Sequence, residues 1–203
     1  MRSVLSYALI AIIGGAIGAG VVQAGGWYDQ AATHLTQATP EPADFWSTPA
    51  IAGYGKIHYV DTPAYKPGTV SGLSNKVVFQ INKYDGDLSR PNISLERVAR
   101  MVNLYSAAGV PLNKLDFVVS MNGSGVLAGL TEAQYHKAYK MDNPNLPLID
   151  ELEKAGVKIT VCDQSVAFEH LQREWIDTRI THTISSGTTV ATLENQGYAL
   201  LML

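Results

Sequence analysis

The sequence predicts an α/β fold with a mainly parallel sheet of about five strands. From Lys76 to the carboxyl terminus, short runs rich in β-branched and aromatic residues alternate with stretches of helical period. Glycine and proline separate most of these runs. Because strands that alternate with helices form parallel sheets, we expect a sheet whose two faces are both covered by helices.

The first half of this region contains two predicted strands and a helix. Residues 76–81 form a β-branched and aromatic run that ends in a turn-like sequence, and residues 115–120 form a second such run. Between them, a helical pattern stops at Gly109 and Pro111. The apolar positions of this helix are Leu95, Val98, Val102 and Tyr105.

The second half repeats the alternation less regularly. Residues 126–141 are predicted to be helical in pieces, and a cleaner helix begins near Pro147 and stops at Gly156. The strand 157–161 follows directly. The remaining predicted elements are a helix over 166–175, a short strand over 181–184, a helix over 187–196 and a buried strand over 198–203.

The amino terminus predicts export, and hence a periplasmic protein. Met1-Arg2 is a short basic start, residues 4–22 are almost all apolar or small, and Val22-Gln-Ala24 fits a small-residue cleavage site. An uncleaved anchor is the alternative, because the apolar stretch approaches the roughly 20 residues that span a bilayer. We expect a signal peptide over residues 1–24, and contact with the membrane only if it is uncleaved.

Residues 25–75 are expected to form an irregular arm. They contain five prolines and show no helical or strand period. From Phe45 onward we expect part of the arm to pack against the domain or against a neighbouring subunit, because solvated linkers contain few aromatic residues. The aromatic residues concerned are Trp46, Tyr54, Tyr59 and Tyr65.

Charge and histidine spacing argue against several classes of partner. The formal net charge is −3, whereas proteins that bind nucleic acid usually carry basic patches. The five histidines are scattered, with no pair three or four residues apart. We therefore expect neither a nucleic-acid partner nor a metal site nor another cofactor.

The single cysteine, Cys162, is the candidate reactive residue. It follows the predicted strand 157–161, at the end of a sheet where open α/β folds place their chemistry. Strand alternation puts Lys158, Thr160 and Cys162 on one face, which we do not expect to be a dry core. Unpaired helical N–H groups can lower the pKa of a thiol, although the adjacent Asp163 disfavours a second negative charge.

Two loops supply the candidate binding residues around this thiol. Right-handed crossovers place the loops after residues 81, 120 and 161 along one edge, so Tyr84, Asn122 and Cys162 are expected to be neighbours. Cys162 with His170 is a weak nucleophile and base pair, since eight residues separate them. The candidate substrate-binding residues are Asn122, Gly123, Gln164 and Ser165.

Several separated segments resemble the DsrE/DsrF-like family in the same order. They are Lys76-Val-Val-Phe79, residues 143–165 around Cys162, and Gln196-Gly-Tyr-Ala-Leu-Leu201. The resemblance covers about residues 76–203, and residues 48–58 are similar to an extension of exported members. One departure is notable: relatives often carry a histidine before the glycine of the second-strand loop, whereas this chain has Asn122, which cannot titrate.

The resemblance implies a DsrE-like three-layer sandwich that assembles into homotrimers or homohexamers. In the best understood members, a cysteine that matches Cys162 carries sulfane sulfur as a persulfide between proteins. We therefore expect a sulfur relay or sulfurtransferase with donor and acceptor proteins as partners. The alternative is a non-catalytic oligomeric binding or scaffold protein in which Cys162 is structural, since cysteine often behaves as a small buried hydrophobe. A cysteine hydrolase is disfavoured because base and orienting residues are not evident.

Overall fold

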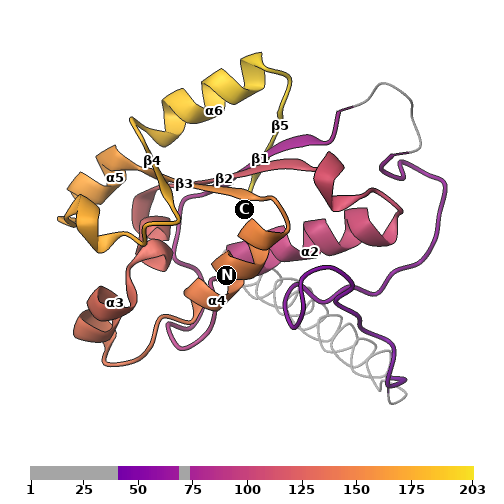
Figure 1. Cartoon of the computed structure of the whole chain (residues 1–203), viewed down its shortest axis with the longest axis horizontal. Helices are drawn as coiled ribbons and strands as arrows, with labels where there is room; N and C mark the ends of the chain where they lie inside the picture. Colours follow the sequence, from indigo (N-terminus) through magenta and orange to yellow (C-terminus); the bar gives the residue numbers. More distant parts are fainter. Residues whose placement is uncertain (1–40, 69–73) are drawn as a thin grey trace, which may run out of the picture. The chain divides into compact units, whose positions relative to one another are not determined.

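A five-stranded, all-parallel sheet forms the centre of the structure, as the sequence predicts (Figure 1). Its order is β4-β3-β2-β1-β5, so β2 lies in the middle. The bounds of the strands differ from the predicted ones by one residue at most. They are β1 (Lys76–Ile81), β2 (Asp116–Met121), β3 (Lys158–Cys162), β4 (Thr181–Thr183) and β5 (Ala199–Met202).

The computed structural model describes residues 41–68 and 74–203. The predicted signal peptide, residues 1–24, and the first part of the arm lie outside the described residues. The segment Trp46–Leu203 is one compact unit, to which the following description refers. Within the described ranges, no helix has the length and apolar character that a membrane crossing requires.

Helices cover the two faces of the sheet unequally. Helices α2 (Ile93–Ala107) and α4 (Asn145–Lys154) cover one face, whereas α6 (Ser186–Asn195) covers the other (Figure 1). Alternate strand residues enter two separate apolar clusters, a large one on the α2/α4 face and a small one below α6. The remaining helices are α3 (Glu132–Tyr139), α5 (Asp163–Phe168) and the short 3₁₀ helices η1 (Leu112–Lys114), η2 (Gly123–Gly129) and η3 (Arg173–Trp175).

The helix predicted over residues 166–175 is wrong in its bounds. Helix α5 begins at Asp163, directly after β3, and ends at Phe168. His170 then has a left-handed backbone (φ 56°), and the N–H groups of His170 and Leu171 donate to the carbonyls of Ala167 and Val166. These two bonds form a Schellman motif, which satisfies the last carbonyls and turns the chain away. The sequence does not predict this end of the helix, because the left-handed position is occupied by His170 and not by glycine.

The last strand is less buried than predicted. Strand β5 lies at an edge of the sheet and pairs only with β1 among the described strands. Leu201 and Met202 expose 38% and 70% of their surface. The apolar run therefore forms an edge strand with exposed side chains, because only β1 flanks it.

Part of the arm packs against the domain. Residues 46–57 lie over α2, where Ile51 and Ile57 are buried. Ser47 and Ile57 form an isolated antiparallel bridge that closes this segment into a loop. Of the two packing partners that the sequence left open, the segment contacts its own domain.

Asn103 holds this loop on α2. Its side chain is completely buried, and both of its polar atoms are fully used. A buried amide with every partner in place ties backbone groups that would otherwise lack hydrogen bonds. Oδ1 accepts from the N–H groups of Ala50 and Ile51 at 2.8 Å each, and Nδ2 donates to the carbonyls of Tyr54 and Gly55 at 2.9 and 3.0 Å.

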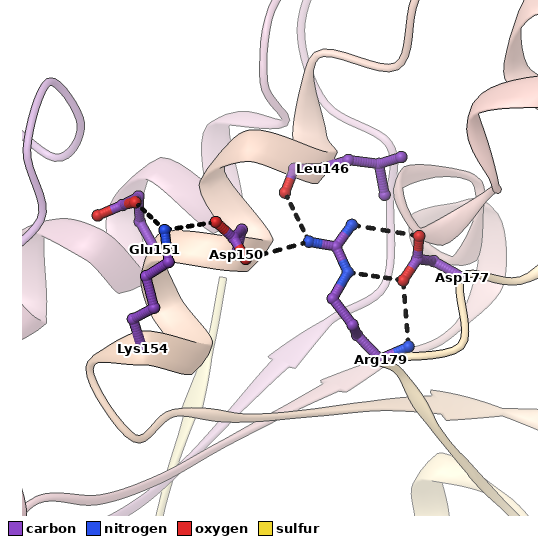
Figure 2. A network of polar contacts seen from close by, with 6 residues as sticks. All are labelled: Leu146, Asp150, Glu151, Lys154, Asp177 and Arg179. Atoms are coloured by element: carbon purple, nitrogen blue, oxygen red, sulfur yellow. Dashed lines mark hydrogen bonds and ion pairs between the residues drawn. The ribbon is translucent and has the colours of Figure 1, made fainter.

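Arg179 ties the chain that enters β4 to helix α4 (Figure 2). Its Nε donates to Asp177 at 2.8 Å, and its Nη1 reaches the carbonyl of Leu146 at 3.4 Å and Asp150 at 3.6 Å. The guanidinium hydrogen bond holds the pKa of Asp177 below its ordinary value. Lys154 binds the same Asp150 at 2.6 Å. This network fixes the start of β4, and β4 borders the site described below.

We expect Asn103→Ala to lower the free energy of unfolding by about 2–4 kcal/mol, because it leaves several buried backbone groups without partners. Chemical denaturation of the full chain measures this. Asn195→Ala is the matched control, since the exposed Asn195 donates only to a carbonyl of its own helix. A loss in Asn103→Ala no larger than in Asn195→Ala would show that the loop contributes nothing to stability.

Candidate functional site

Cys162 is the last residue of β3 and immediately precedes α5. Cys162 pairs in register with Thr183 of β4. The residue before it, Val161, belongs to the large apolar cluster on the α2/α4 face. Because side chains alternate along a strand, the thiol points to the face that α6 covers. The residue is 4% exposed.

The thiol is buried but lies among hydrogen-bond donors. Burial raises the pKa of Cys162, yet hydrogen bonds from the Ser165 hydroxyl and from the N–H groups of Ser186, Ser165 and Gln164 outweigh that effect. The pKa of the thiol is therefore lowered from its ordinary value. Two of the N–H groups belong to the first turn of α5 and one to the first residue of α6. Donors of this kind favour the thiolate, which is the reactive form of cysteine.

The face that carries Cys162 is polar and largely covered. Lys158, at the start of β3, is exposed and binds Asp116 at 3.0 Å. Thr160 is buried and donates to the carbonyl of Val119 at 2.8 Å. This face therefore carries polar groups near the thiol, and its apolar packing is confined to the small cluster below α6.

Ser186, which the sequence did not single out, joins the sheet to α6 at this point. Its buried hydroxyl accepts from the Ser120 hydroxyl at 2.9 Å and from Gln80 Nε2 at 3.1 Å. Ser185 is the N-cap of α6 and accepts from the N–H of Thr188. The sequence contains a signal for this arrangement: Ser185 and Ser186 follow the fourth predicted strand, whose carboxyl end must lie at the same edge as that of β3.

The structure brings the predicted binding residues together around the thiol. The Gly123 N–H donates to the Ser165 hydroxyl at 2.9 Å, which leaves that hydroxyl's own proton for Cys162. Gly123 has a φ of 50°, and a Cβ there would lie 2.4 Å from the Asn82 carbonyl, so only glycine fits. The side chain of Gln164 donates to the carbonyl of Ile184. Gln164 thus contributes its backbone to the thiol and its side chain to the end of β4.

Asn122 lies beside Cys162 with an unused acceptor. Met121 and Val161 are paired, so the next residues, Asn122 and Cys162, are neighbours across the two strands. Asn122 has an extended backbone (φ −144°, ψ 178°), which keeps its side chain on the thiol's face. Its Oδ1 is buried and has no hydrogen-bond partner among the described residues. A buried polar atom without a partner is uncommon, so this oxygen is a candidate contact for a group bound at the thiol.

Tyr84, the third predicted neighbour, turns away from the thiol. Its backbone N–H donates to the Ser124 hydroxyl, so the loops after β1 and β2 do lie side by side. Its own hydroxyl, however, bonds to the hydroxyl of Tyr135 at 2.9 Å and to Asn145 Nδ2 at 3.0 Å. Tyr84 is therefore part of the buried contact with α3 and α4.

Asp163 binds partners that the sequence did not suggest. His182 Nδ1 donates to one of its oxygens at 2.5 Å, and Arg173 Nε lies 3.5 Å from the other. His182 pairs in register with Val161, so these groups occupy the opposite face of the sheet from the thiol. The repulsion expected between Asp163 and a thiolate is thus reduced, and His182 is not placed as a base for Cys162.

Two further histidines of the described residues have surroundings of their own. His170 is exposed at the stop of α5, and His136 binds Asp142 at 3.6 Å. Within residues 41–68 and 74–203, no three His, Cys, Asp or Glu side chains cluster closely enough to hold a metal ion. A hollow of about 800 Å³ lies between residues 58–68 and the carboxyl end of α2, near the amino end of β1 and thus at the opposite edge of the sheet from Cys162.

Comparison with known proteins identifies one family. The DsrE/DsrF-like family model matches residues 75–203. Two solved structures are similar: the ychN protein from E. coli (17% identity, 64% of this chain and 100% of that chain, TM-score 0.46) and the protein of unknown function MTH1491 from Methanobacterium thermoautotrophicum (16% identity, 63% and 97%, TM-score 0.43). No curated protein matches the chain.

We expect Asn122→Ala to leave the free energy of unfolding unchanged or to raise it by up to about 1 kcal/mol, because it removes a buried acceptor that has no partner. Asn143→Ala is the matched control. The buried Asn143 bonds to the carbonyls of Ala128 and Leu130 and to the N–H of Asn145, so its loss should cost about 2 kcal/mol or more. Chemical denaturation of both variants measures these changes. If Asn122→Ala lowers the free energy of unfolding as much as Asn143→Ala does, Asn122 is a structural residue.

Proposed function

Because the chain belongs to the DsrE/DsrF-like family, we propose that it is an exported sulfur carrier in which Cys162 holds sulfane sulfur as a persulfide. The observation that carries the proposal is the set of donors around a single thiol. One hydroxyl and three backbone N–H groups converge on Cys162 and lower its pKa despite its burial. A cysteine with only a packing role does not need such donors.

The proposed reaction is an exchange of one sulfur atom between thiols. The Cys162 thiolate attacks the outer sulfur of a donor persulfide, a new S–S bond forms, and the donor's S–S bond breaks with its electron pair leaving on the donor thiolate. An acceptor thiolate then attacks the outer sulfur held on Cys162, and the Cys162 thiolate is regenerated. No oxidant or reductant is consumed, because the number of S–S bonds is unchanged.

Nearby groups have roles in this exchange. The donors that favour the Cys162 thiolate also favour it as the leaving group of the second step, because a thiol of lower pKa leaves faster. The side-chain amide of Asn122 is the candidate contact for the outer sulfur, since it lies beside the thiol with an unused oxygen. An amide does not titrate, so Asn122 itself cannot act as an acid or a base in the exchange.

The surroundings of the site support partners that are proteins. Phe168 ends α5 and Ile184 follows β4, and they expose 82% and 77% of their surface. The side chain of Gln164, in the first turn of α5, donates to the carbonyl of Ile184. A partner protein that docks on these side chains would bury them, which is favourable for apolar surface. We propose that donor and acceptor proteins dock there, and that Leu201 and Met202 on the edge strand contribute to a homotrimer or homohexamer.

We expect the full chain to gain the mass of one or more sulfur atoms when it is incubated with glutathione persulfide, and Cys162→Ser to gain none. Intact-mass spectrometry measures the adduct, and a later incubation with excess acceptor thiol should remove it. Asn122→Ala should load more slowly than the unaltered protein while it keeps its stability.

The alternative is a scaffold protein in which Cys162 has only a packing role. This alternative predicts different results in the same experiments. Cys162→Ala then lowers the free energy of unfolding by well over about 1 kcal/mol, and no sulfur adduct forms on the unaltered protein. For a sulfur carrier we expect the adduct together with a smaller loss of stability. Absence of the adduct at all donor concentrations, in protein shown to be folded, would overturn the proposal.

A further inference from the structure

Two side chains of the sheet meet the first residue of α6 close to the thiol without belonging to the loops around it. Ser120 on β2 and Gln80 on β1 both donate to the hydroxyl of Ser186, at 2.9 and 3.1 Å. Ser120 and Ser186 are buried. The positions that pair across the strands, Gln80 with Ser120 and Ser120 with Thr160, put Gln80 and Ser120 two residues before the level of Cys162.

Ser186 connects these bonds to the thiol through its backbone. As the first residue of α6, it has an N–H group without a partner inside the helix. That N–H is one of the donors to Cys162. The Ser186 hydroxyl thus anchors the residue to the sheet, while the N–H of the same residue faces the sulfur.

We propose that Ser120 and Gln80 are positioning residues that hold the amino terminus of α6 against the sheet and so keep the Ser186 N–H directed at the Cys162 sulfur. This inference rests on the proposed function of Cys162 as a thiolate. Hydrogen bonds weaken steeply as distance and angle depart from their optimum, so a small shift of the helix end is sufficient to remove the donor. The hydrogen bond from the Ser186 N–H to the thiol therefore depends on Ser120 and Gln80, which act through the Ser186 hydroxyl.

No charged group near the thiol among the described residues depends on Ser120 or Gln80, so these two residues do not act on the pKa of Cys162 through a charge. His182 on β4 and Arg173 in η3 both bind Asp163 on α5, and His182 lies on the opposite face of the sheet from the thiol. The only charged residue of α6 is Glu194, near its carboxyl end. Ser120, Gln80 and Asn122, on the neighbouring strands and their ends, carry no charge. A shift in the titration of Cys162 in the variants below therefore reports the Ser186 donor.

The test is the pH titration of the Cys162 thiolate in the full chain, followed by ultraviolet absorbance with Cys162→Ser as the blank. Since Cys162 is the only cysteine, the difference signal has a single source. Ser120→Ala and Gln80→Met should raise the midpoint, and Ser186→Ala should raise it by about 0.5–1 pH unit, the equivalent of one hydrogen bond. Ser120→Ala added to Ser186→Ala should produce no further shift, because both act through one hydroxyl.

Thr160→Val is the matched control. It removes a buried hydroxyl on the same face, two residues before Cys162, whose bond goes to the carbonyl of Val119 and not to Ser186. It should lower stability without moving the midpoint. An unchanged midpoint in Ser186→Ala, or an equal shift in Thr160→Val, would overturn the inference. If Ser120→Ala does not fold, Ser186→Ala and Gln80→Met still test the inference, because neither changes the buried residue 120.

The titration tests the positioning role of Ser120 and Gln80, and the sulfur-loading experiment tests the sulfur carrier, so either proposal can be refuted without the other. A shifted midpoint with no sulfur adduct on the unaltered protein would refute the sulfur carrier but keep Ser120 and Gln80 as positioning residues. An adduct with an unshifted midpoint would keep the carrier and refute the positioning role.

Discussion

The alternation of side chains in a parallel sheet is the constraint on which the rest of this structure depends. Because every strand runs in the same direction, the residue after each strand lies at one edge, and alternate residues of all strands share a face. Phe79, Phe117 and Ile159 thereby enter one large apolar cluster below α2 and α4. Gln80, Ser120 and Cys162 are assigned to the other face by the same rule.

The two faces of the sheet consequently differ in how much apolar surface they bury. The face below α2 and α4 supplies most of the buried apolar area. The loop 46–57 adds Ile51 to it, and the amide of Asn103 on α2 holds that loop in place. The face below α6 contains only a small apolar cluster, around Val78, Val118 and Val190. Stability is concentrated on one side, so the other side can retain polar groups, and an asparagine oxygen without a partner, beside a thiol.

The environment of Cys162 combines two opposing effects. Burial removes water from the sulfur and disfavours its charge, while hydrogen bonds from Ser165, Ser186 and Gln164 favour it. The result is a thiol of lowered pKa that is largely shielded from bulk solvent. In the sulfur carrier that we propose, this shielding would protect a reactive sulfur species from hydrolysis and oxidation.

The sequence by itself determined the strands, most helices and the position of Cys162 at a strand end, because these depend on local periodicity and on glycine and proline stops. It could not determine the end of α5, where His170 takes a conformation usual for glycine, or the exposure of β5. Only the tertiary structure decided what surrounds the thiol. Ser186 lies 24 residues further along the chain and His182 pairs with Asp163 across two strands, so both depend on strand order and register, which periodicity does not encode.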